Sequence, residues 1–151
     1  KHPEIKAECL KWFEPFFSYL AQSSAHTFVR LKKVTTPGSF IYLISDFRGL
    51  DKSAETQLTQ LAQHNSVVLI FIYDPFEANL PERSILPLQY ADKKILLNTA
   101  EKEVRARYKQ HFIQRLDQLT ALSHRLGVSL IPCQTTDNIH HLFSTPHQFA
   151  S

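Results

Sequence analysis

The chain of 151 residues is 43% hydrophobic and 21% charged, a composition typical of a soluble globular domain and unlike that of a disordered chain. Its formal net charge of +3 is too small to argue by itself for binding nucleic acid. No apolar run approaches the ~20 residues of a membrane span, and the polar residues 1–11 do not resemble a signal peptide. We therefore expect a single cytoplasmic domain over 1–151, with no nucleic-acid partner and no direct membrane contact.

Two further features concern the ends of the chain and its redox chemistry. Cys9 and Cys133 lack the spacing of a metal site, so buried thiols are favoured, with a disulfide as the alternative. The chain has no methionine. We expect it to begin inside a longer product, whose upstream part could carry a membrane anchor.

An amphipathic helix is predicted over 3–22, with Pro3 at its first position. Pro15 should kink or end this helix nearby. Its apolar residues recur at three- and four-residue steps and form one stripe: Ile5, Cys9, Phe13, Phe16, Phe17 and Leu20.

Two buried strands follow, with a helix between them. The apolar runs 39–45 and 66–73 predict buried strands, and the second strand should be covered on both faces. Between them, the pattern of Leu58, Leu61 and Ala62 predicts a helix over about 52–64, capped by Asp51 or Ser53.

The second half begins with a predicted loop over 76–84 and a hairpin over 85–97. The longest helix is predicted over about 99–126, where Asn98 and Glu101 have the spacing of a capping box. Its inner stripe consists of Val104, Tyr108, Phe112, Leu116, Leu119, Leu122 and Leu126. Gly127 should end the helix, before a short strand over 128–132 and a last helix over 137–143.

Five basic residues are predicted on the outer faces of the long helix: Lys102, Arg105, Arg107, Lys109 and Arg115. They could form a nucleic-acid patch. A solvated face is favoured, because Glu101, Glu103 and Asp117 are interleaved with them.

The alternation of buried strands with amphipathic helices predicts an α/β fold with a doubly wound, mainly parallel sheet, flanking helices and a hairpin insertion. Three core strands are few for such a sheet, and exposed apolar edges are a liability. Either further strands lie outside this chain, or a partner covers an edge, for instance a second copy in a homodimer.

The carboxyl ends of the first two strands carry the candidate chemistry. Asp46 follows the first strand and Asp74 the second, so both carboxylates should lie at one crevice. With Ser45 and Glu77 they offer oxygen ligands that suit Mg²⁺ or Ca²⁺. The alternative is that Asp46 and Asp74 cap the turns that follow them. The three glycines are too scattered for a phosphate loop, and no serine stands in a nucleophile elbow.

A series of short motifs resembles the carboxyl-terminal half of the bacterial domain of unknown function 58 family. The motifs are 34–39 (VTTPGS), 43–51 (LISDFRGLD), 61–65 (LAQHN), 73–77 (YDPFE), 80–81 (LP) and 125–128 (RLGV). They cover about residues 32–135, and residues 1–31 match poorly. The resemblance implies a von Willebrand factor A-like fold, here truncated, and an association with MoxR-type AAA+ ATPases.

In that fold, three loops form a metal-ion-dependent adhesion site. Asp46, with Ser45 beside it, matches the third loop, and Thr27 is a possible match to the second. The Asp-x-Ser-x-Ser motif of the first loop is absent, so the resemblance implies an incomplete site that would hold Mg²⁺ only if the missing loops were supplied.

The resemblance favours a non-enzymatic interaction module, an adaptor of a MoxR-type ATPase that binds through the edge formed by Asp46, Phe47, Arg48, Asp74 and Glu77. The alternative is a Mg²⁺-dependent hydrolase or nuclease that uses Asp46, Asp74 and Glu77.

Overall fold

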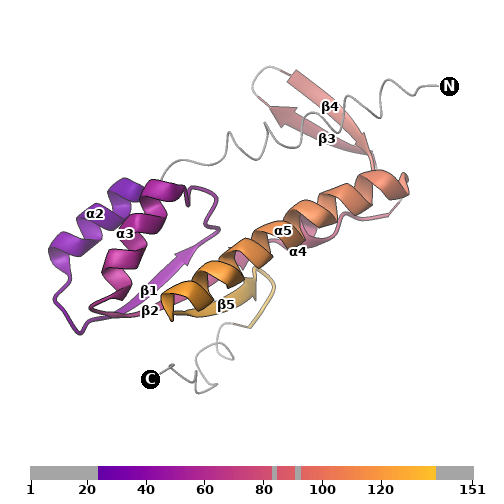
Figure 1. The fold of residues 1–151 in the computed structure, drawn as a ribbon. Helices are drawn as coiled ribbons and strands as arrows, with labels where there is room; N and C mark the ends of the chain where they lie inside the picture. Colours follow the sequence, from indigo (N-terminus) through magenta and orange to yellow (C-terminus); the bar gives the residue numbers. More distant parts are fainter. Residues whose placement is uncertain (1–23, 83–84, 91–92, 139–151) are drawn as a thin grey trace.

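A computed structural model describes residues 24–82, 85–90 and 93–138 (Figure 1). Its main sheet is parallel, in the order β1 (Phe40–Ser45), β2 (Ser66–Tyr73) and β5 (Ser129–Gln134). A separate antiparallel hairpin consists of β3 (Ile85–Tyr90) and β4 (Lys93–Asn98). These elements confirm the predicted α/β class, its parallel sheet and its hairpin. The helix predicted over 3–22 lies outside the described residues, as does nearly all of that over 137–143.

The central strand β2 is the most deeply buried element of the sheet. It pairs with β1 and β5 in register, so that Leu69 lies opposite Leu43 on one side and Leu130 on the other. Val68, Leu69 and Phe71 are fully buried. The continuous apolar run of this strand therefore reflects burial on both faces, as predicted.

Three helices cover one face of the sheet: α2 (Ala25–Val34), α3 (Lys52–Ala62) and α5 (Lys102–Leu126) (Figure 1). They contribute Phe28, Leu58, Leu61, Leu119 and Leu122 to the main core, which also contains Ile41, Val67, Leu69 and Phe71 of the sheet. Full burial of each such side chain stabilises the fold by about 1.5–3 kcal/mol. Val68, Ile70 and Cys133 form a second cluster on the opposite face. Cys133 is a buried free thiol.

Several local predictions are confirmed by the hydrogen bonds that begin and end the helices. Asp51 is the N-cap of α3, and its carboxylate accepts from the Ala54 N–H at 2.8 Å. Gly127 ends α5 in the left-handed conformation, with φ of 63°. Among the described residues, no helix has both the length and the apolarity needed to cross a membrane.

Four predictions need correction. The strand β1 was expected to be buried, but Phe40, Tyr42 and Ile44 are exposed on one of its faces, because the described helices pack on the other face, which carries Ile41. Residues 75–78 form a short helix, α4 (Pro75–Ala78), where a loop was expected, because Asp74 and Glu77 make a capping box around Pro75. The long helix begins at Lys102 rather than near 99, because Asn98 accepts from the Ala100 N–H at 3.1 Å and so holds a turn instead of capping the helix. No helix was predicted at α2, which buries mainly Phe28.

Candidate functional site

The loop after β1 is shaped by two side chains that accept hydrogen bonds from the backbone. The Ser45 hydroxyl accepts from the Phe47 N–H at 3.0 Å, and the Asp46 carboxylate accepts from the Arg48 N–H at 3.2 Å. Phe47 between them has a φ of 53°, a conformation that costs a non-glycine residue about 1–2 kcal/mol. Its ring is buried in the core at 6% exposure. Phe47 therefore offers little side-chain surface at the predicted interaction edge, and its place there remains a prediction.

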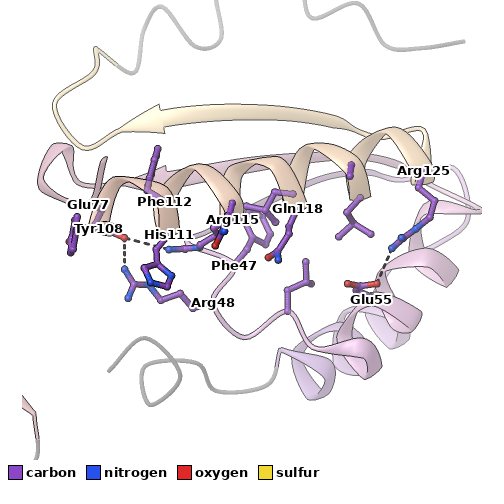
Figure 2. A pocket seen from close by; sticks show the side chains of 15 residues that line it. Phe47, Arg48, Glu55, Glu77, Tyr108, His111, Phe112, Arg115, Gln118 and Arg125 are labelled. Carbon is purple, nitrogen blue, oxygen red and sulfur yellow. Dashed lines mark hydrogen bonds and ion pairs between the residues drawn. The ribbon is translucent and has the colours of Figure 1, made fainter. Parts of the chain in front are cut away.

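A cluster of ion pairs joins this loop to α4 and α5. Glu77 forms ion pairs with Arg48 and with Arg115, whose Nη1 lies 3.5 Å from the Glu77 Oε2 (Figure 2). The Arg48 Nε lies 3.0 Å from the Asp46 Oδ2, and Arg115 donates to the Asp46 carbonyl oxygen. The Arg115 guanidinium also lies 5.0 Å above the Phe71 ring, within cation–π range. We call Asp46, Arg48, Glu77 and Arg115 the arginine cluster.

Much of the arginine cluster is shielded from water. The side chains of Arg48, Arg115 and Glu77 are 11%, 20% and 24% exposed, whereas that of Asp46 is 47% exposed. Burial lowers the pKa of Arg115, as does the nearby Arg48, while Asp46 and Glu77 oppose the change. Burial, followed by the charge of Glu77, raises the pKa of Tyr108. Tyr108 is therefore a neutral phenol at physiological pH.

Asp74 has a structural role at the end of β2. Its carboxylate accepts from the Phe76 N–H at 2.8 Å, and the Asp74 N–H donates to the Glu77 carboxylate at 3.4 Å. The Thr135 hydroxyl lies 3.4 Å from the other carboxylate oxygen. Together with the turn at Asp46, these bonds confirm the capping interpretation of both aspartates.

The proposed metal ligands lie on two elements. Ser45 ends β1 and Asp46 follows it, whereas Thr27 is an exposed residue in the first turn of α2. Within the described ranges, no group of three or more His, Cys, Asp or Glu side chains is placed to hold a metal ion. A joint role of Asp46, Ser45 and Thr27 in binding Mg²⁺ remains a prediction.

A groove of about 680 Å³ lies between the loop after β1 and α5 (Figure 2). Leu50, Leu119 and Leu122 are among its apolar lining residues. Arg48 and Arg115 line it as well, and an exposed ion pair of 2.9 Å between Glu55 and Arg125 also borders it. The groove is therefore of mixed polarity, since Gln114 and Gln118 of α5 also line it, and this composition suits an amphipathic segment.

The groove was not predicted, although α5 carries a signal for it. Tyr108, Phe112, Arg115, Leu119 and Leu122 recur at three- and four-residue steps, so they share one helix face. An arginine within such a mainly apolar stripe indicates that its charged side chain points toward the protein interior.

The prediction that all five basic residues of α5 are solvated is wrong for two of them. Arg115 belongs to the arginine cluster, and Arg105, at 20% exposure, donates to the carbonyl oxygens of Thr99 and Ala100. Lys102, Arg107 and Lys109 are exposed, as expected. The long helix therefore uses part of its charge to bind neighbouring backbone.

Comparisons with models of known protein families, with curated proteins and with solved structures found no match to this chain.

Proposed function

We propose that this chain is a non-enzymatic protein-interaction module with a von Willebrand factor A-like fold, and that it works as an adaptor of a MoxR-type AAA+ ATPase. The sequence motifs around Asp46 and Asp74 support the family and the partner. One observation supports a non-enzymatic role: Asp46 and Glu77 pair with the chain's own arginines, and Asp74 accepts from a backbone N–H.

A hydrolase built on Asp46, Asp74 and Glu77 would need their oxygens available to a metal ion or substrate. Glu77 instead binds two arginines, and Asp74 caps α4. Moving Glu77 away would leave two partly buried guanidiniums without this partner, which is strongly unfavourable. The arrangement therefore favours a rigid contact surface over a reactive site.

The accessible part of this surface is centred on Asp46, the most exposed member of the arginine cluster. A carboxylate held by a neighbouring arginine keeps a fixed direction, which reduces the entropy lost when a partner binds. We expect Asp46 to contact the ATPase directly, with Arg48, Glu77 and Asp74 holding the edge in shape.

The test is a pull-down of the protein with a MoxR-type ATPase in the nucleotide-free, ADP and ATP-analogue states. We expect a complex in at least one state, at least fivefold weaker with Asp46→Ala and unchanged with Asp117→Ala, which alters an exposed aspartate on α5. Absence of a complex in every state would overturn the proposed partner. Mg²⁺- or Mn²⁺-dependent hydrolysis that is lost when Asp46 and Asp74 are both changed to alanine would overturn the non-enzymatic assignment.

A further inference from the structure

We infer that the groove beside α5 is the docking site of residues 3–20 of the same chain, the segment with the apolar stripe. This inference goes beyond the proposed adaptor function and does not depend on it.

The described part of the chain begins beside the groove. The Ser24 N–H donates to the Gly49 carbonyl oxygen at 2.8 Å. Gly49 stands between Arg48 and Leu50, which both line the groove. The chain that arrives at Ser24 is thus fixed beside the groove wall. Leu20 is four residues away, a distance of at most ~14 Å even when fully extended.

The groove and the segment are both of mixed polarity. The groove combines apolar residues such as Leu50 and Phe112 with the polar side chains of Gln114 and Gln118. The segment presents six apolar residues at helical spacing and has polar residues between them. The apolar residues are Ile5, Cys9, Phe13, Phe16, Phe17 and Leu20. Soluble monomers rarely expose a contiguous apolar patch larger than a few hundred Å², so this stripe needs a cover, and the groove lies next to its point of attachment.

The segment and the groove also match in length. From Ile5 to Leu20 a helix rises ~22 Å, and the groove-lining part of α5, from Tyr108 to Arg125, rises ~26 Å. A helix can therefore lie along α5 with its whole stripe in the groove. Pro15 would bend this helix, and the apolar stripe continues on both sides of the bend.

Photo-crosslinking of the full chain tests the inference. Phe13 is replaced by p-benzoylphenylalanine, and the cross-links are mapped by mass spectrometry. The matched control places the same group at Lys11, on the opposite side of the predicted helix. We expect the probe at position 13 to link to Leu50 or to residues 114–122 of α5, and the probe at Lys11 to link there at least fivefold less.

A groove variant and a matched control on the same helix separate docking from unfolding. Ala121 is exposed and lines the groove, whereas Ala106 is exposed on the same helix and does not line it. We expect Ala121→Trp to reduce the cross-link at least fivefold because it fills the groove, and Ala106→Trp to leave it unchanged. Equal yields in the two variants would overturn the inference.

Mixing isotopically labelled and unlabelled chains identifies the occupant. Cross-links confined to chains of one label support docking within the same chain. Mixed-label cross-links in the groove would overturn it in favour of a second copy. Cross-links to Tyr42 or Ile44 of β1, or none at all, would overturn the groove as the docking site.

Discussion

Replacing Glu77 with glutamine tests whether the arginine cluster holds the carboxyl edge of the sheet together. Glu77 forms ion pairs with Arg48 and Arg115, and it also contacts the Asp74 N–H. Glutamine has nearly the same shape and keeps one oxygen acceptor, but it carries no charge. The variant therefore removes the electrostatic part of the contacts and leaves the packing of α4 in place.

The expected loss follows from the exposure of the three side chains. Removing one partner of a fully buried ion pair costs about 3–5 kcal/mol. Here Glu77 is 24% exposed and its two arginines 11% and 20%, so water compensates part of the loss and we expect about 2 kcal/mol. The control is Glu55→Gln. The pair of Glu55 with Arg125 is 39% and 63% exposed, and exposed pairs contribute about 0–1 kcal/mol.

Urea denaturation followed by circular dichroism measures both variants. We expect Glu77→Gln to lower the midpoint without changing the slope of the free energy against urea, and to lower Tm by about 4–8 °C. If Glu77→Gln and Glu55→Gln shift the midpoint equally, the arginine cluster does not stabilise this edge and the reasoning is refuted.

Three further predictions concern a cap, a helix end and a buried phenol. Asp51→Ala should cost about 1 kcal/mol because it removes the carboxylate that accepts from the Ala54 N–H; Ser53→Ala, its control, should change the urea midpoint little. Gly127→Ala should cost about 1 kcal/mol, through the left-handed backbone alone, because no atom lies within 4 Å of the added methyl; an unchanged Tm would contradict this. Burial raises the pKa of Tyr108 above its ordinary 10.0, so its contribution to stability is complete below that pH and is lost as the pH rises through the folded-state pKa. Urea midpoints measured on both sides of pH 10.0 should therefore fall less steeply for Tyr108→Phe than for the wild type.

The parallel sheet could be predicted because its strands are continuous apolar runs between turn residues. Residues 66–73 form β2 as expected, since a strand covered on both faces needs no polar positions. The helix α2 could not be predicted as readily. Of its ten residues only Phe28 is buried, and the surrounding Thr27, Val29 and Val34 do not favour a helix.

Part of the candidate site could likewise be predicted from the sequence, and part of it could not. Asp46 and Asp74 were placed at the carboxyl edge because topology alone brings the ends of neighbouring parallel strands together. Arg115 could not be placed there, since it lies 69 residues from Asp46 and reaches it only because α5 packs across the sheet. A sequence pattern therefore predicts the ends of strands more readily than it predicts the distant arginines that pair with the carboxylates there.

The groove and the carboxyl edge share Arg48, which contacts Asp46 and Glu77 and also lines the groove. A partner that draws Asp46 away from Arg48 would change the charge presented to whatever occupies the groove. Binding free energies are reciprocal between coupled sites, so the occupant must then alter the affinity of the partner by the same factor. The two proposals together predict that saturating ATPase changes the cross-link yield from position 13. They also predict that Ala121→Trp, which removes the occupant from the groove, changes the affinity for the ATPase. A cross-link yield that the ATPase leaves unchanged would show that Arg48 does not connect the two surfaces.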